Sequence, residues 1–344
     1  MPDYRDLVDF IRGPVREKPF IAIWALPPNT AGVVGGIPDM IRYYFDVEER
    51  IRLEKELKEL LPEALILPGF WPSLGVVVEA SAFGGQMIWS RKGAPHIFPA
   101  FRSIRKVDSF KMPKAGEAGM TPLFLTQLEV MRRILKTQGM DVDPLIKSMG
   151  PAEVCGLLLG YENFFLGLYD EGKRLKSLME MVTQFIIQWL HLQERELGEP
   201  LLLQLAEHVP HQVSVEHLKE FILPFLQAIY AEFPRQVKVY HNEGLHSDEH
   251  IKLVLRFGAD IWHFGSDAHD LSELYAKIGD AIVPFGGVNP HGPIRHGTSD
   301  QVREETRRVL KAARGRKLLL STGTGTTPET TLENVRAMVE AAMS

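Results

Sequence analysis

The chain has 344 residues, of which 45% are apolar and 24% are charged, and its formal net charge is −5. This composition supports a large apolar core and excludes a disordered chain. The acidic balance, without a basic block, argues against nucleic acid and against an anionic membrane surface as partners. The single cysteine, Cys155, excludes an intrachain disulfide and a cysteine-cluster metal site.

The N-terminal segment has charged residues inside its apolar pattern, which is not typical of a signal peptide. The most apolar windows, such as MVTQFIIQWLHL, are short and interrupted by polar residues, so none is expected to span a bilayer. We therefore expect a soluble, cytoplasmic protein.

The first half of the chain predicts a few strands and several helices. Short apolar runs predict strands over 20–26, 63–69 and 84–91. An apolar stripe with a charged opposite face predicts a helix over 47–62. The middle of the chain is predicted to be helical, over 121–139, 152–170 and 172–198.

From residue 200 onward, strands and helices alternate regularly. Five apolar runs, each followed by an amphipathic stretch, predict strands over 200–208, 236–244, 259–266, 281–290 and 317–325. Successive strand–helix units indicate parallel strands joined by right-handed crossovers. We expect an α/β protein with one (β/α)8 TIM-type barrel over residues 1–344 and additional N-terminal helices. An open, doubly wound sheet is the alternative.

Polar residues follow the predicted strands, at the ends where a barrel carries its chemistry. His241 and Glu243 end one strand, two residues apart, so both side chains point to the same side. His263 ends the next strand, and neighbouring strands lie about 4.8 Å apart. Two imidazoles and a carboxylate form a zinc site with an open position. A hydrogen-bonded pair without metal and an acid–base pair remain alternatives.

Other strand-end residues complete the predicted site. Glu207 is expected to be catalytic together with His241 and Glu243, and it can be a further ligand, a partner of a ligating histidine or a member of a buried ion pair. The aromatic side chains of Trp24 and Trp262 are expected to bind a flat substrate. The remaining substrate contacts are expected from two hydrogen-bonding side chains, Asn29 and His208.

The C-terminal half resembles the uroporphyrinogen decarboxylase superfamily, which contains the decarboxylases of haem synthesis and corrinoid-dependent methyltransferases. The matching segments are VSVEHLKEFILPFLQAIY, YHNEGLHSDEHIKLVLRFGADIWHFGS, FGGVNP and LLSTGTGTTPETTLENVRAMVEAA. With the Gly-Pro segment that begins MGPAEVCG, they cover most of residues 148–344. The resemblance implies an α/β barrel.

The decarboxylases carry an arginine-rich segment near the first strand that binds substrate carboxylates. Here the segment 19–46 has no arginine before Arg42, so bidentate partners for many carboxylates are missing. The N-terminal half, from YYFDVEERIRLEKELKELL onward, resembles the methyltransferases instead.

In the members that methylate a thiol, zinc is held by a His-x-Cys motif and by a later cysteine. This chain has His241-Asn242-Glu243 at the first motif and Thr324 at the later position. A carboxylate in place of thiolates leaves a harder, more Lewis-acidic metal, which suits the polarisation of an ether or phenolate oxygen.

The resemblance then implies a zinc-dependent methyltransferase that moves a methyl group from a small O-methylated, aromatic substrate to a corrinoid protein carrying cob(I)alamin. A uroporphyrinogen-type decarboxylase, a thiol-methylating enzyme and a non-catalytic binding protein are the alternatives. Whether Glu207, His208 or Thr324 enters the metal shell, and whether the chain forms a homodimer, stays open.

Overall fold

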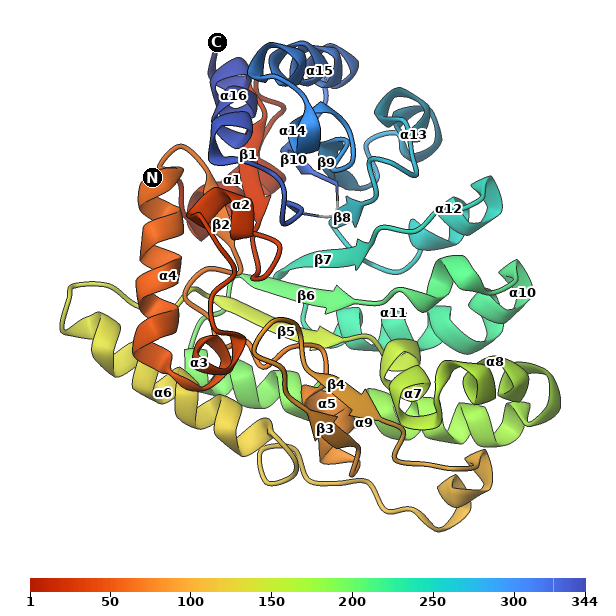
Figure 1. Cartoon of the computed structure of the whole chain (residues 1–344). Helices are drawn as coiled ribbons and strands as arrows, with labels where there is room; N and C mark the ends of the chain where they lie inside the picture. The colour runs from red at the N-terminus through yellow and green to blue at the C-terminus, as the bar shows by residue number, and fades with distance from the viewer. Residues whose placement is uncertain (324) are drawn as a thin grey trace.

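Eight parallel strands form the centre of the molecule. The computed structural model describes residues 1–323 and 325–344. The eight strands are hydrogen-bonded in the order β2-β1-β10-β9-β8-β7-β6-β5 and curl into a barrel, with helices outside (Figure 1). Their bounds are β1 Phe20–Trp24, β2 Leu65–Leu67, β5 Leu145–Met149, β6 Leu202–Ala206, β7 Val237–Asn242, β8 Ile261–Phe264, β9 Val283–Val288 and β10 Leu319–Thr322. The predicted barrel is confirmed, and the open sheet is not formed.

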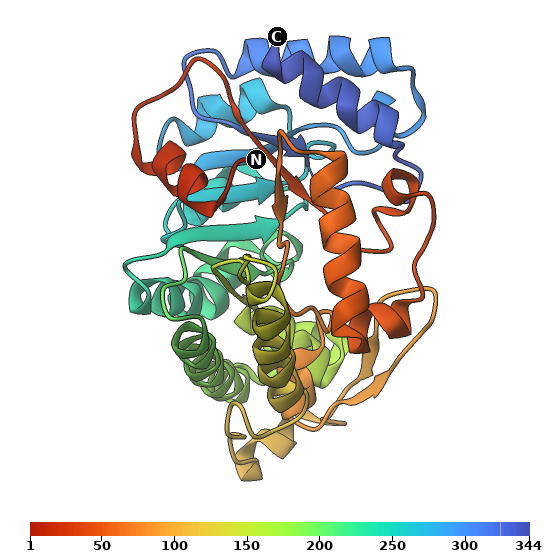
Figure 2. The same ribbon diagram turned by 90° about the vertical axis from the view of Figure 1, so that its left-hand side faces the viewer.

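Helices cover the outside of these strands (Figure 2). Their bounds are α1 Tyr4–Arg12, α2 Ala31–Val34, α3 Met40–Phe45, α4 Val47–Leu60, α5 Val78–Ala82, α6 Thr121–Lys136, α7 Pro151–Leu159, α8 Tyr161–Asp170, α9 Gly172–Leu197, α10 Val215–His217, α11 Leu223–Glu232, α12 Asp248–Val254, α13 Leu271–Ile278, α14 Pro293–His296, α15 Ser299–Ala312 and α16 Leu332–Met343. Among the described residues, no helix has both the length and the apolar character that a membrane span requires.

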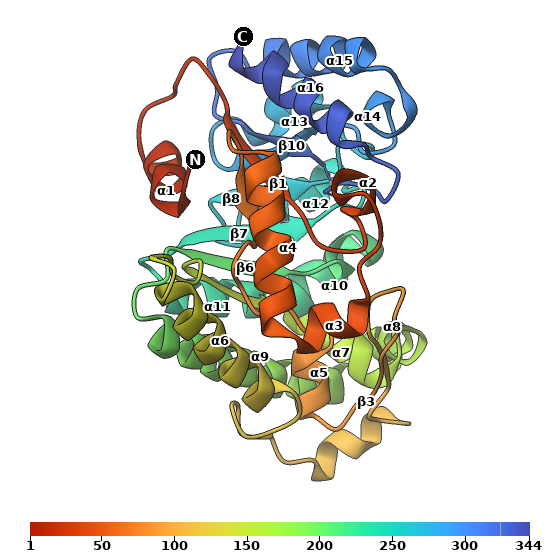
Figure 3. The same cartoon turned by 60° about the vertical axis from the view of Figure 1, so that its left-hand side comes forward.

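The N-terminal third differs most from the sequence-based expectation. The strand predicted over 84–91 is β3 (Gln86–Ile88), which pairs with β4 (His96–Phe98) in an antiparallel hairpin outside the barrel. The third barrel strand along the chain is instead β5, which lies between two stretches predicted as helices. Helix α4 runs past β1 and packs on β2 (Figure 3). It begins at Asp46, whose carboxylate accepts a hydrogen bond from the Glu49 amide.

Individual glycine and proline residues set the ends of the helices α7 and α8, which follow β5. The segment predicted as one helix over 152–170 is two helices, α7 and α8, because Gly160 between them has a φ of 78°. Pro151 occupies the first turn of α7, where its missing N–H costs nothing. Helix α7 therefore starts directly after β5 and points its N-terminus toward the end of β6.

The barrel is completed between β2 and β5 by the residues that flank these strands. The Phe70 amide donates to the Asp143 carboxylate (2.6 Å), and the Asp143 amide donates to the Phe70 carbonyl (2.9 Å). Lys58 forms an ion pair with the same carboxylate at 3.0 Å. The partly buried Asp143 thus joins the two ends of the ladder.

The register of the strands aligns the candidate residues. Ala206 is paired with His241, His241 with His263, and His263 with Phe285. Paired residues of neighbouring parallel strands point to the same side, which here is the barrel interior. The residues two positions further on, at the carboxyl ends of β6 and β7, point to that side as well.

Candidate metal centre

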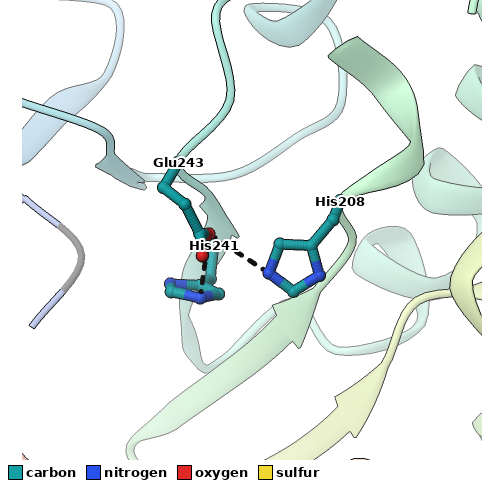
Figure 4. Close-up of side chains that lie close together, drawn as sticks. All are labelled: His208, His241 and Glu243. Carbon is teal, nitrogen blue, oxygen red and sulfur yellow. Dashed lines mark ion pairs between the residues drawn. The ribbon is translucent and has the colours of Figure 1, made fainter. Parts of the chain in front are cut away.

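Three side chains from two neighbouring strands meet at the mouth of the barrel. His241 lies near the end of β7 and Glu243 directly after it, while His208 follows β6 by two residues. The Glu243 Oε2 atom lies 3.1 Å from His208 Nε2 and 3.3 Å from His241 Nε2 (Figure 4). Period-two alternation explains this arrangement, because His208 stands on the same side of β6 as Ala206, the partner of His241.

This arrangement fits a metal ion. Among the described residues, His208, His241 and Glu243 form the one group of potential ligands whose donor atoms all lie within 4.8 Å of one another. The Glu243 Oε2 atom is buried, and its polar contacts in the described part of the chain are the two ion-pair contacts with His208 and His241. A buried oxygen of this kind, facing two imidazole nitrogens, matches the donor set of a catalytic zinc site.

Each histidine of the group is held through its other ring nitrogen. His208 Nδ1 lies 3.4 Å from the Glu153 carboxylate, and His241 Nδ1 lies 2.7 Å from His263 Nδ1. Metal-binding histidines typically have such a partner, which fixes the ring and the tautomer. Both Nε2 atoms are therefore left to face Glu243.

Glu153 is itself fixed by several contacts. It lies on α7, and its carboxylate accepts hydrogen bonds from the Tyr161 hydroxyl and from the His208 amide, the latter at 3.2 Å. The Oε2 atom of Glu153 thus contacts both the backbone amide and the ring of His208. The sequence analysis missed Glu153, because no spacing rule connects a helix residue with a strand end 55 positions later.

His263 lies behind His241 and does not belong to the group of three donor atoms. It is fully buried and stacks on Phe285, with ring centroids 4.1 Å apart. If the Nδ1 atom of His241 donates, that of His263 accepts, and its proton sits on Nε2, which has no hydrogen-bond partner within the described residues. The structure thus places this predicted ligand in contact with a second predicted ligand, His241.

Burial and the contacts within the group shift the pKa values of all three side chains. Burial lowers the pKa of His208, but the hydrogen bonds and charges of Glu153 and Glu243 outweigh burial and raise this pKa to about 10. Burial raises the pKa of Glu243, but the neighbouring His241 and His208 outweigh it and lower this pKa. Burial also lowers the pKa of His241. A cation bound between these groups would displace the proton of His208.

Glu207, predicted as catalytic, points away from this group. Its carboxylate accepts hydrogen bonds from the amides of Ala152 (2.8 Å) and Glu153 (3.0 Å) at the start of α7. Burial raises the pKa of Glu207 to about 8, while the backbone donors act against burial. Gly150 permits this approach, because an added Cβ would lie 2.4 Å from the carboxylate. Glu207 therefore fixes the helix that carries Glu153.

The predicted substrate-binding aromatic residues occupy different places. Trp24 lies at the site, with its ring stacked on His241 at a centroid distance of 5.8 Å. Trp262 is not brought to the site, because it alternates with His263 and faces the outer layer, where its indole N–H donates to the Asn242 carbonyl.

Of the two remaining predicted positions, one lies at the rim of the barrel and the other is not among the described residues. Asn29 is exposed in the loop after β1, and its carbonyl accepts a hydrogen bond from Thr326. Thr324 lies outside the described residues.

Comparisons with known proteins give a consistent family. A family model described as uroporphyrinogen decarboxylase matches residues 60–344. Curated uroporphyrinogen decarboxylases from two strains of Prochlorococcus marinus are 24% and 23% identical over 180 residues, which is 50% of this chain and 48% of each relative. The match thus spans about half the length of these curated relatives.

Solved structures share the fold. A methyltransferase from Methanosarcina mazei is 19% identical, with a TM-score of 0.80 over 100% of this chain and 99% of that chain. A B12-independent methionine synthase from a Shewanella species is 13% identical, with a TM-score of 0.55 over 94% of this chain and 97% of that one. At these identities the likeness concerns the barrel and its helices.

Proposed function

This chain belongs to the uroporphyrinogen decarboxylase family, and we propose that it is a zinc-dependent methyltransferase. The proposed reaction moves a methyl group from a small O-methylated, aromatic substrate to cob(I)alamin carried by a partner corrinoid protein. The observation that carries this proposal is the convergence of His208, His241 and Glu243 at the barrel mouth. A carboxylate and two imidazoles at this place would leave a harder, more Lewis-acidic metal than thiolate ligands would, which suits the activation of an oxygen.

The three residues would hold zinc, which supplies Lewis-acid polarisation of an ether oxygen when it is bound at such a site. The chain's own residues keep the ligands in place: Glu153 holds the His208 ring and His263 holds the His241 ring. Ligand rings held in this way preserve the open position toward the substrate.

The aromatic wall beside the group would position a flat substrate. Trp24 is 9% exposed, and its ring forms one side of the barrel interior next to His241. A methoxylated ring stacked on Trp24 would place its ether oxygen toward His241 and Glu243. The same packing would exclude water from the oxygen.

Two alternative activities fit the side chains less well. The names of the curated relatives favour a decarboxylase, which should bind substrate carboxylates through arginines. The buried Arg50 instead donates to the carbonyl groups of Tyr43, Tyr44 and Ser73. A thiol-methylating enzyme should use cysteine ligands, whereas Cys155 is buried in α7.

Metal analysis of untagged protein tests the proposal directly. We expect about one zinc per chain in the wild type, and loss of zinc in Glu243→Gln and in His208→Gln. His217→Gln is a matched control, because His217 lies on α10, away from the three ligands. Folding of all variants is checked by circular dichroism.

Methyl transfer is then measured by the absorbance of cob(I)alamin mixed with a methoxylated arene. The wild type and His217→Gln should show transfer, and the two ligand variants should not. Protein that binds no zinc under any loading condition, or ligand variants that keep wild-type turnover, would contradict the proposal and favour the decarboxylase.

A further inference from the structure

A lysine lies inside the barrel, close to the candidate metal centre. Lys147 is the third residue of β5 and is paired with Gln204 on the interior side. Its ammonium nitrogen lies 4.7 Å from the Trp24 ring centroid and 5.6 Å from the Trp71 ring centroid. The two indole rings stabilise the charge by cation–π contact. Within the described residues, the ammonium group has no ion-pair or hydrogen-bond partner.

A second donor beside Lys147 also lacks a partner. Trp71 is only 7% exposed, and its indole N–H has no acceptor in the described part of the structure. A buried donor without an acceptor lowers stability, so such groups are rare unless a ligand or a water completes them. Trp71 and Lys147 line the same pocket, whose other walls include Leu26, Val78, Phe124 and Trp189.

The one carboxylic acid of this pocket, Glu79, forms no ion pair with the lysine among the described residues, although the two groups influence each other through space. Glu79 accepts a hydrogen bond from the Ser148 hydroxyl at 2.9 Å, and burial raises the pKa of Glu79. Burial lowers the pKa of Lys147 to about 8, so most of the lysine stays protonated at neutral pH. The pocket therefore presents a positive charge and an N–H donor among apolar and aromatic walls.

We propose that Lys147 and Trp71 form a carboxylate-binding subsite and that the substrate is a methoxylated aromatic carboxylate. This inference rests on the proposed function and specifies its substrate class. Trp24 connects the two places, because its ring is 4.7 Å from the lysine nitrogen and 5.8 Å from the His241 ring. One benzene ring lying along Trp24 can direct its carboxylate to Lys147 and its ether oxygen to the metal centre.

The apolar walls favour an aromatic carboxylate over a small inorganic anion. Leu26, Val78 and Phe124 would contact a ring but offer no side-chain donor to the remaining oxygens of a phosphate. Inorganic phosphate is therefore expected not to compete with the aromatic ligand at equal concentration. Competition by phosphate would overturn the assignment.

Ligand binding measured by calorimetry on the full chain tests the subsite without turnover. The probes are para-methoxybenzoate and its neutral analogue para-methoxybenzyl alcohol. Lys147→Met should weaken binding of the carboxylate about tenfold to a hundredfold, the usual range for a charged hydrogen bond. Binding of the alcohol should change less than about twofold. Lys238→Met, a lysine on the outer side of β7, is the matched control and should bind both probes like the wild type.

A second variant separates the subsite from general packing. Trp71→Phe keeps a ring against Phe124, at present 4.9 Å away, but removes the N–H. It should weaken carboxylate binding several-fold and leave alcohol binding unchanged. Equal losses for both probes in Lys147→Met, or no loss for the carboxylate, would overturn the subsite.

The results also distinguish this inference from the proposed function. Selective loss of carboxylate binding without any methyl transfer would sustain the subsite and refute the methyltransferase. If Lys147→Met still transfers methyl groups from neutral arenes and binds the carboxylate as the wild type does, the subsite is refuted but the methyltransferase is not.

Discussion

The role of Glu153 as the partner of His208 can be measured through metal affinity. Glu153→Gln keeps the shape of the side chain, so one amide oxygen can still accept from both the ring and the amide of His208. The amide nitrogen can face the Tyr161 hydroxyl, which then accepts. The variant therefore loses the negative charge but not the geometry, whereas Glu153→Ala loses both.

These contacts set the size of the expected effect. Loss of the partner of a metal-binding histidine typically weakens metal binding about 10–100-fold. Because its geometry survives, Glu153→Gln should lie near the lower limit, about 1.4 kcal/mol. Glu153→Ala should lie near the upper limit, about 2.7 kcal/mol. Both values refer to the free energy of zinc binding.

Zinc affinity is measured by competition with a chromophoric chelator at neutral pH. Glu162→Gln is the matched control, because Glu162 is exposed on the adjacent helix α8. It should bind zinc like the wild type. If Glu153→Gln and Glu153→Ala both stay within about twofold of the wild type, His208 is held by other contacts and the assigned role is wrong.

Three further predictions concern stability and the site. Burial raises the pKa of Glu54 from 4.5 to about 8, so the folded chain keeps this proton between those pH values while the unfolded chain releases it. The free energy of unfolding should therefore fall as pH rises through this window, and Glu54→Gln should flatten that fall in urea denaturation; an unchanged slope would refute this. His263→Ala should weaken zinc binding about tenfold in the chelator assay, whereas the outward-facing Trp262→Phe should not; equal affinities would count against the pairing. Gly150→Ala should lower stability by about 1–3 kcal/mol, because its Cβ would meet the carboxylate that caps α7, and Gly93→Ala, with open space around it, should lower it by less than about 0.5 kcal/mol in thermal unfolding.

The regular half of the fold follows from its sequence pattern. Each strand range predicted after residue 200 contains the observed strand, as 236–244 contains Val237–Asn242. Short apolar runs, each followed by an amphipathic helix, leave few other arrangements. Local pattern was sufficient there because every strand pairs with the strand before it in sequence.

The same method failed at β5 for a physical reason. Its sequence, LIKSM, contains Lys147 at an inward position, and the charge interrupts the apolar run that marks a buried strand. Two indole rings make this position tolerable, one at the end of β1 and one after β2, and no local pattern reveals them. The residue that hid the strand is also the one that the structure brings to the pocket.

The site was accessible from the sequence only in part. Period two places His241 and Glu243 on one side without any structure. The position of His208 depends on the register between β6 and β7, and that of Glu153 depends on how α7 docks, and neither is encoded in spacing. Alternation along the chain explains why Glu207 faces α7, since it points to the opposite side from His208.

The strand order fixes when the barrel can be completed as the polypeptide leaves the ribosome. Strands β5 to β10 can zip together one after another, each beside the strand synthesised just before it. Strand β1 can pair early with β2, but it joins the sheet of β5 to β10 only through β10, which is the last strand to emerge. Trp24, at the end of β1, can therefore reach His241 only late in synthesis, so the aromatic wall of the centre should form after its histidines are in place.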